Sequence, residues 1–519
     1  MTDGHPIQIV DLTDDHSFEL NEDHLRDILF HPDCKSKKVV VISIAGAFRK
    51  GKSFLLDFFL RYLRADDKDN WMGCKNEPLT GFHWRGGCER DTTGIIMWSK
   101  PFIVKKSNGE AIAILLMDTQ GAFDSMSTVR DCATVFALSL MLSSVQIYNL
   151  TQNVQEDDLQ HLNLFAEYGT LALNSCNETP FQKLTFLVRD WSYPYEAHYG
   201  YDGGEKLLEK RLKMNPDQHA ELRTLRQQLI DSFKKINCFL MPHPGLKVAS
   251  HPQFDGRLSE VEPEFLQQLN ELVPSIFSPT ELLVKEINGE EITGTQLFEY
   301  FKAYYKVFQS DELPHPKAVL QATAEANNLA AKANARDFYL QQMEEHCGGD
   351  RPYMHLKHLI RYHDLAANLA IEKFTMAKKM GGEELSLQYL NELAKEINHL
   401  KENYVKQNDS KNIFAFSRTP TTFLSCMIIS YFICSLMKAM WLDSLSTLFM
   451  MSFWISFIFL FLWLYCKYSG EHKDFGEYLD TIADMIWTNV YQPIYQQFVQ
   501  TSVRSIVNST NIDNHSKSD

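Results

Sequence analysis

The segment Gly46–Ser53 has the residue types and the spacing of a phosphate-binding loop. Its sequence GAFRKGKS fits the pattern GxxxxGK[ST], and it lies between an apolar run and a helical pattern, Phe54–Tyr62. Glycines let backbone N–H groups curl around a β-phosphate, and Lys52 would neutralise the β- and γ-phosphate oxygens. Ser53 would coordinate Mg²⁺. The segment therefore predicts a site for a nucleoside triphosphate.

Two further motifs carry groups that a magnesium-dependent triphosphate site needs. Asp118-Thr119-Gln120-Gly121 follows the apolar run Ala111–Met117, so Asp118 would hold Mg²⁺ and the Gly121 N–H would face the γ-phosphate. Between this motif and the phosphate-binding loop lies the sequence RDTTG, residues 90–94. Its Thr92 would coordinate Mg²⁺ and respond to the γ-phosphate. The alternative for these residues is an ordinary surface loop.

The dipeptide Arg189-Asp190 ends a third apolar run, Leu184–Val188. A carboxylate beside a purine accepts hydrogen bonds from the N1–H and N2–H₂ groups of guanine, which adenine does not offer, so Asp190 would select GTP. A salt bridge at the end of a strand is the ordinary explanation for such a dipeptide. Its position at the carboxyl end of a strand, where α/β nucleotide sites assemble, favours base recognition.

Buried strands must bring these loops together. Lys38–Ala45, Ala111–Met117 and Leu184–Val188 are short apolar runs that end in loop residues, as strands buried on both faces of a sheet do. Helical patterns alternate with such runs over residues 1–308. We therefore predict an α/β fold there: a P-loop GTPase domain with a mixed sheet flanked by helices.

The chain changes character after residue 308. Residues 309–317 contain Pro314 and Pro316 and are predicted to form a linker, since neither proline suits a helix interior. Residues 318–410 show helical periodicity without a strand-like run. Glycine pairs at 348–349 and 381–382 divide them, so we predict an all-α three-helix bundle.

Two apolar segments, 421–441 and 445–466, follow the predicted bundle. Leu445–Cys466 carries no charge and is as long as the roughly 20 apolar residues that cross the hydrocarbon core of a bilayer, whereas Thr421–Met437 is shorter. The alternative is a pair of buried core helices, which seldom need so long a segment that is apolar on every face. We predict a transmembrane helical hairpin.

The flanks of the hairpin predict its orientation and a tail. Basic residues lie at both outer flanks, against Lys438 alone in the connection, so both termini should be cytosolic. Residues 470–507 are predicted to form a cytosolic amphipathic tail helix in the bilayer interface, with docking on protein as the alternative. Residues 508–519 are predicted to be a disordered tail.

Composition excludes some classes of function. The net charge of −15, from 51 basic and 66 acidic side chains, speaks against nucleic acid as a partner, because a duplex binder needs a basic surface. The ten cysteines include no CxxC pair, which indicates reduced thiols rather than a zinc site or a disulfide framework. The N-terminal residues do not have the pattern of a secretory signal.

Taken together, the motifs resemble those of the atlastins, dynamin-superfamily GTPases of the endoplasmic reticulum. The resemblance rests on GAFRKGKSFLLDFFLRY, RDTTGIIMW, DTQGAFDS, FLVRDW and CFLMPHPGLKV, in this order, and covers nearly the whole chain. It implies that GTP-loaded domains on apposed membranes form a homodimer, that their middle domains cross, and that homotypic fusion of reticulum tubules follows. The expected location is the endoplasmic reticulum membrane; the lipid bilayer and other reticulum-shaping hairpin proteins are candidate partners.

The resemblance also assigns roles to single residues. It implies Mg²⁺ coordination by Ser53, Thr92 and Asp118, with Lys52 on the phosphates and a further switch role for Gln120. His251 stands where many relatives have asparagine, so its contact with the nucleotide stays open. The remaining positions expected to contact the nucleotide are Arg49, Lys50, Gly51, Phe54, Gly121, Arg189, Asp190 and Val248, the last in the loop that covers the guanine.

Arg49, inside the phosphate-binding loop, resembles the arginine that these enzymes turn inward on dimerisation as an arginine finger. A guanidinium placed against the transferring phosphoryl group stabilises the charge that develops there, so Arg49, Lys52 and Thr92 are the predicted catalytic residues. The alternative is a solvated arginine beside Lys50.

Two rival functions stay open at this point. In the first, the hairpin shapes or tethers membranes and the G domain only regulates it. In the second, the chain is a soluble-type relative from the guanylate-binding group, which more often uses C-terminal lipidation; the apolar segments and the absence of a CaaX cysteine argue against it.

Overall fold

The structure is a computed structural model, and it describes residues 4–13, 16–84, 92–106, 108–121, 128–176, 178–309, 313–349, 351–411, 413–469, 473–491 and 493. The chain divides into two compact units. One comprises Met1–Leu340 with Ala367–Ile397, and the other comprises Gln341–Ala366 with Asn398–Asp519. Arg90 and Asp91 of the predicted switch motif lie outside the described residues.

A nine-stranded mixed sheet forms the centre of the first unit, in the order β2-β1-β4-β6-β3-β7-β8-β9, with β5 also paired to β6. The strands are β1 (Pro6–Leu12), β2 (Phe18–Leu20), β3 (Val39–Gly46), β4 (Ile95–Trp98), β5 (Phe102–Lys105), β6 (Ala111–Thr119), β7 (Val145–Thr151), β8 (Phe181–Arg189) and β9 (Phe233–Leu240); a separate hairpin pairs β10 (Glu286–Ile287) with β11 (Glu290–Glu291). Strands β6, β3, β7, β8 and β9 run parallel, and β1, β2, β4 and β5 make the antiparallel part. The prediction of a mixed sheet is confirmed.

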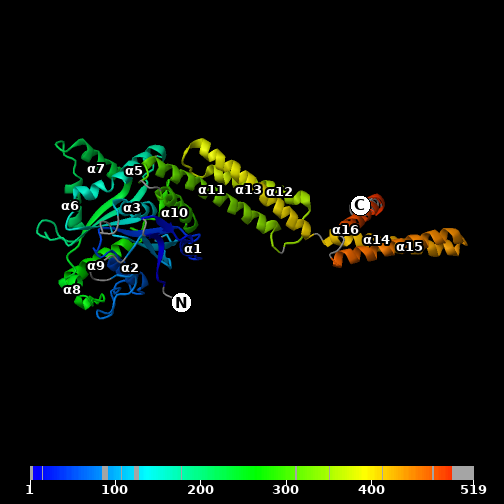
Figure 1. Cartoon of the computed structure of the whole chain (residues 1–519), viewed down its shortest axis with the longest axis horizontal. Helices are drawn as coiled ribbons and strands as arrows, with labels where there is room; N and C mark the ends of the chain where they lie inside the picture. The colour runs from blue at the N-terminus through cyan, green and yellow to red at the C-terminus, as the bar shows by residue number, and fades with distance from the viewer. Residues whose placement is uncertain are drawn as a thin grey trace, which may run out of the picture. The chain divides into compact units, whose positions relative to one another are not determined.

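Helices cover both faces of this sheet, as Figure 1 shows for α2 and α9 below it and α3, α5 and α10 above it. The helices of this part of the chain are α1 (Glu22–Leu29), α2 (Lys52–Arg64), α3 (Val129–Leu142), α4 (Glu156–Gln160), α5 (Asn163–Cys176), α6 (Tyr201–Leu212), α7 (Ala220–Ser232), α8 (Leu246–Ser250), α9 (Pro263–Phe277) and α10 (Gly294–Phe308). Strand β3 serves both layers, because Val39 and Val41 face one core while Val40 and Ile42 face the other. A central strand buried on both faces explains why its sequence is a continuous apolar run.

The predicted three-helix segment forms α11 (Pro316–Cys347), α12 (Leu356–Met376) and α13 (Gly382–Ser410), with breaks at the predicted glycine pairs. The linker is shorter than predicted because Pro316 is the first residue of α11, where its missing N–H costs no hydrogen bond. In the first unit, the Lys332 ammonium lies 3.1 Å from Glu392 of α13. In the second unit, the Tyr404 hydroxyl donates to Glu344 at 3.2 Å.

Two long apolar helices, α14 (Ile413–Ala439) and α15 (Asp443–Ser469), pack against each other in the second unit. The hydroxyls of Ser430 and Ser452 lie 3.2 Å apart across the pair. Mean hydropathy reaches 1.6 over Ser417–Ala439 and 2.1 over Asp443–Ser469, and both stretches are long enough to cross a membrane. Only 22% and 11% of their most apolar windows are buried, whereas core helices of a soluble protein would be mostly buried. The candidate hairpin is therefore present.

The tail helix α16 (Lys473–Ile486) docks on these two apolar helices. Leu479 and Ala483 are buried, and the Asp480 carboxylate accepts hydrogen bonds from Thr419 of α14 at 2.5 Å and from the indole N–H of Trp463 of α15 at 2.7 Å. Over the described part of the tail, α16 therefore contacts α14 and α15, and its insertion in the bilayer interface stays a prediction. Residues 494–507, and the predicted disordered segment 508–519, lie outside the described residues.

A lysine without a carboxylate hydrogen-bond partner lies in the interior of the first unit. The Lys285 side chain is only 1% exposed and its ammonium donates to the backbone carbonyl of Ser143 at 2.9 Å. Burial lowers the pKa of Lys285 to about 7, and Glu286 opposes this shift. In an unfolded chain the pKa returns to about 10.4, so between these two values the unfolded state binds more protons than the folded state.

We predict that Lys285→Met stabilises the protein most at low pH. The cost of the buried ammonium is largest below pH 7 and disappears as the pH rises towards about 10.4, because stability rises wherever the unfolded state binds more protons. Between pH 6.5 and 9.5 the advantage of the variant should shrink by roughly 3 kcal/mol. Thermal unfolding of the purified chain in detergent at both pH values checks this. The exposed Lys317→Met is the control, and a pH-independent difference for Lys285→Met contradicts the prediction.

Candidate nucleotide site

The phosphate-binding loop connects β3 to α2, which begins at Lys52. Gly51 caps this helix in the left-handed region, at φ 69°. The Lys52 ammonium is buried and donates to the carbonyls of Gly46, at 3.3 Å, and Ala47, at 3.2 Å, within the loop. A phosphate bound in the loop would offer this ammonium stronger, charged acceptors.

Three oxygen-bearing side chains converge beside the first turn of α2. The Ser53 hydroxyl donates to Asp118 at 2.5 Å, and the Thr92 hydroxyl lies 3.3 Å from Ser53 and 3.4 Å from Asp118. Burial raises the pKa of Asp118 to about 6, and the Lys52 ammonium and the Ser53 hydroxyl offset part of the shift. Two hydroxyls and a carboxylate fit Mg²⁺, which takes few protein ligands and completes its shell with phosphate oxygens and water.

Among the described residues no group of three or more His, Cys, Asp or Glu side chains gathers as metal ligands. The two hydroxyls and one carboxylate beside α2 also differ from the Cys, His and carboxylate sets that hold zinc.

The two predicted switch segments are joined to each other and to the loop. The Gln120 side-chain oxygen accepts from the Gly94 N–H at 2.9 Å, and the Gln120 N–H donates to the Gly94 carbonyl at 2.8 Å. Gln120 therefore ties the segment of Thr92 to β6 and does not line the cavity. Gly121 does line it: a Cβ there would lie 2.4 Å from the Phe48 Cα, so only glycine allows this close approach.

The base end of the site follows β8. Asp190 has a left-handed backbone, at φ 58°, and its side chain lines the cavity. The Arg189 side chain instead reaches the phosphate-binding loop, where its guanidinium lies 3.4 Å and 3.5 Å from the carbonyls of Lys50 and Gly51. Burial lowers the pKa of Arg189, and Asp190 opposes this shift. Arg189 thus contacts the phosphate-binding loop, while Asp190 lines the cavity, and its reading of a base stays a prediction.

Arg49 occupies the turn of the phosphate-binding loop with a left-handed backbone, at φ 59°. Its guanidinium lies 5.7 Å from the centre of the Phe48 ring, and the residue lines the cavity. A non-glycine residue in this conformation is strained, and such strain clusters at functional sites.

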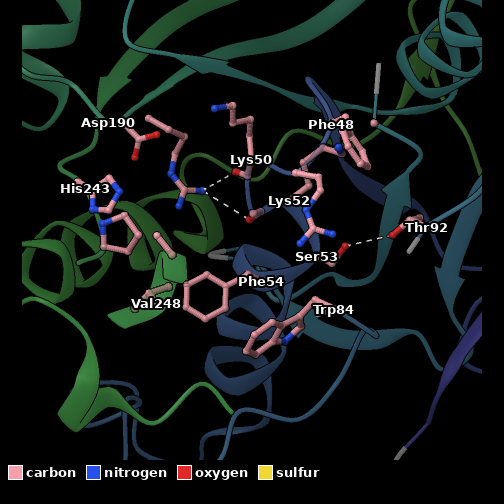
Figure 2. Close-up of a pocket in the computed structure, with 16 residues that line it drawn as sticks. Phe48, Lys50, Lys52, Ser53, Phe54, Trp84, Thr92, Asp190, His243 and Val248 are labelled. Carbon is pink, nitrogen blue, oxygen red and sulfur yellow. Dashed lines mark hydrogen bonds between the residues drawn. The ribbon is translucent and has the colours of Figure 1, made fainter. Parts of the chain in front are cut away.

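These residues surround one cavity of about 490 Å³, a size typical of small-molecule sites. Figure 2 shows Asp190, His243 and Val248 at one end and Phe48 and Thr92 at the other. The structure brings most of the predicted site residues to this wall: Arg49, Lys50, Gly51, Lys52, Ser53, Phe54, Thr92, Gly121, Arg189, Asp190 and Val248. His251 is exposed and does not line it.

Sequence reasoning missed five lining residues: Phe48, Trp84, His243, Pro244 and Ala249. His243 and Pro244 follow β9, the next parallel strand after β8, so their position at the carboxyl end of a strand was an available signal. Trp84 had no such signal, because it lies outside any strand-end motif.

Comparison with known proteins supplies the family. Residues 15–286 match the family described as "Guanylate-binding protein, N-terminal domain", and residues 288–413 match "Guanylate-binding protein, C-terminal domain". Atlastin-2 of Homo sapiens is 52% identical over 506 residues, 97% of this chain and 87% of that protein. Atlastin-1 of Bos taurus is 54% identical over 482 residues, covering 93% and 86%. Atlastin-2 of Xenopus laevis is 51% identical over 511 residues, covering 98% and 90%.

Proposed function

Because the chain belongs to the atlastins, GTPases of the dynamin superfamily within the guanylate-binding protein family, we propose that it couples GTP hydrolysis to tethering and homotypic fusion of endoplasmic reticulum membranes. The observation that carries this proposal is that one chain holds both a GTPase site and a packed pair of apolar helices long enough to cross a bilayer. Hydrolysis at the first can then do work on the membrane that holds the second.

Hydrolysis is proposed as an in-line attack of water on the γ-phosphate, which needs positioning and electrostatics more than a carboxylate base. When bound, Mg²⁺ would supply charge neutralisation on the β- and γ-phosphate oxygens. Ser53, Thr92 and Asp118 would hold it with the oxygens that already converge. Lys52 would exchange its backbone acceptors for phosphate oxygens, and Asp190 would accept the N1–H and N2–H₂ of guanine.

Two copies of the chain on apposed membranes would meet through their GTP-loaded domains. Arg49 would then complete each site as an arginine finger, because contact between two copies can press the guanidinium onto the phosphates. In this scheme dimerisation completes the site and hydrolysis follows it, so the homodimer forms before GTP is cleaved. Other hairpin proteins of the reticulum are proposed partners of α14 and α15.

Both termini are proposed to lie in the cytosol. The basic side chains at the outer flanks of the hairpin are Lys411, Arg418, Lys467 and Lys473, whereas Lys438 alone lies near the connection. Asn-x-Ser/Thr sequences check this orientation, because none should carry a glycan if it faces the cytosol; two of them begin at Asn149 and Asn408, which are buried in the fold. The other two, Asn177 and Asn508, lie outside the described residues.

The test is lipid mixing between two populations of liposomes that carry the purified full-length protein. We expect mixing with GTP·Mg²⁺ and none with a non-hydrolysable GTP analogue. Lys52→Ala protein in both populations is the control for nucleotide binding, and wild-type protein in one population tests whether both membranes need a copy. Mixing with the analogue, or without nucleotide, would contradict the coupling to hydrolysis.

The alternative function is tethering or curvature shaping by the hairpin, with the G domain in a regulatory role. It predicts GTP hydrolysis and clustering of liposomes without mixing of their lipids. Light scattering for clustering and dye dequenching for mixing, recorded on the same samples, separate the two functions.

A further inference from the structure

A buried carboxylate on α2 lies close to the nucleotide site but takes no part in the proposed chemistry. Asp57 is one helical turn after Ser53 and has no exposed surface. Its two oxygens accept a hydrogen bond from the Phe82 N–H at 2.6 Å and another from the indole N–H of Trp84 at 2.8 Å. Burial raises the pKa of Asp57 to about 7, and these two hydrogen bonds oppose the shift. A buried acidic group is costly unless it is paired, so the pairing calls for an explanation.

The segment around Trp84 is fitted closely to this carboxylate. A Cβ at Gly81 would lie 2.3 Å from an Asp57 oxygen, so glycine is required for the approach. Asp57 therefore fixes this segment at three residues: it lies against Gly81 and accepts hydrogen bonds from Phe82 and Trp84.

Trp84 in turn connects two walls of the nucleotide cavity. Its ring lies 5.1 Å from that of Phe54, the residue after Ser53, and 5.7 Å from that of Phe254, and the latter two rings are 6.0 Å apart. Trp84 and Phe54 both line the cavity, where Figure 2 shows them close together. Phe254 is three residues after His251, the C-cap of α8, which carries the lining residue Val248.

A backbone contact fixes the same connection. The Leu79 N–H donates to the carbonyl of Asp255 at 3.0 Å. The segment from Leu79 to Trp84 is therefore attached to α2 by Asp57 and to the residues after α8 by Phe254 and Asp255. A shift of Trp84 would move the wall beneath the base as well as the wall beside Ser53.

We propose that Asp57 is a positioning residue for nucleotide binding, which acts by holding the Trp84 indole where it supports α8 and the base end of the cavity. Loss of this support should raise the dissociation rate of guanine nucleotide, while the phosphate groups that carry the chemistry stay in place. The inference rests on the proposed nucleotide site and is independent of membrane fusion.

The first variant is Trp84→Phe, which keeps an aromatic ring and removes the N–H that Asp57 accepts. With the full-length chain in detergent, we expect the Kd of a fluorescent N-methylanthraniloyl GDP to rise about ten-fold, mainly through faster release, since hydrogen bonds to buried charged groups are among the stronger ones. In steady-state hydrolysis the KM for GTP should rise while kcat at saturating GTP stays within about two-fold of wild type.

The second variant is Asp57→Asn, which leaves a single acceptor oxygen for the Phe82 N–H and the Trp84 indole N–H, places an amide donor against one of them, and should weaken binding by a similar factor. If Asp57 acts through Trp84, adding Trp84→Phe to Asp57→Asn causes little further loss, and the two changes are strongly non-additive. A general loss of structure would instead lower kcat as well as raise KM, and the losses of the two single variants would add in the double variant. Should Trp84→Phe fail to fold, Asp57→Asn carries the test.

Trp71→Phe is the matched control. Trp71 packs in the same core, and its indole N–H donates to Asn270 at 2.8 Å, but it does not line the cavity. We expect its Kd to equal that of the wild type. Wild-type Kd in Trp84→Phe, an equal rise in Trp71→Phe, or additive losses in the double variant would overturn the proposal. Absence of binding by the wild type in the same titration would instead overturn the nucleotide site itself.

Discussion

Replacing Arg49 with alanine will lower kcat for GTP by about 10³-fold or more and will leave nucleotide affinity within a few-fold of wild type. Arg49 lines the cavity within the phosphate-binding loop, where a guanidinium would add to the charge of Lys52 in stabilising the transferring phosphoryl group. The backbone at this position is left-handed in the native loop, and alanine has to adopt the same strained conformation. The substitution therefore removes the side chain and leaves the strain of the loop unchanged.

Two matched variants make this result specific. Arg49→Lys keeps a positive charge but lacks the planar fork of donors, so it should recover only part of the lost rate. Lys52→Ala should lose nucleotide binding itself, because its ammonium is the buried cation of the loop. Single-turnover hydrolysis and titration with a fluorescent nucleotide separate the two effects. Wild-type turnover in Arg49→Ala would exclude the finger role.

Replacing Asp190 with asparagine will lower the affinity for guanine nucleotides by at least about 10²-fold and reverse the preference towards xanthine nucleotides. A carboxylate accepts from both N1–H and N2–H₂ of guanine, whereas an amide places its own donor against the N2 amine. Xanthine carries a carbonyl at C2, which restores the second hydrogen bond. The variant is isosteric, so the phosphate end of the cavity should be unaffected.

Competition of GDP and xanthosine diphosphate against a fluorescent nucleotide measures the reversal. Glu196→Gln, the same chemical change at an exposed residue that does not line the cavity, is the control and should bind as wild type does. Equal loss of both nucleotides in Asp190→Asn would show that Asp190 maintains the shape of the site and does not read the base.

The features that sequence reasoning found are those that local patterns determine. The strands before Gly46, Asp118 and Asp190 are apolar on both faces, so their periodicity predicts a buried parallel core and places the loops at one edge. Breaks at glycine pairs and the length of the apolar segments are equally local signals. These patterns were sufficient for the order of the strands and long helices and for most of the cavity wall.

The features that sequence reasoning missed depend on the direction in which a side chain points in the folded protein. Arg189 points to the phosphate-binding loop and Gln120 onto Gly94, and neither direction follows from a motif. Trp84 enters the cavity because a carboxylate on a different element accepts its N–H. Helix α14 begins before the predicted span because hydropathy marks what lipid can contact, whereas a helix starts where its backbone hydrogen bonds start.

The hydrogen bonds of Asp480 have a mechanical consequence for the anchor. Its carboxylate takes one donor from each apolar helix, Thr419 near the start of α14 and Trp463 near the end of α15, so these two helix ends cannot move apart without breaking one of the bonds. The tail helix therefore cross-links the open end of the hairpin. A force that reaches α14 is transmitted to α15 as well, so it does not separate one helix from the other.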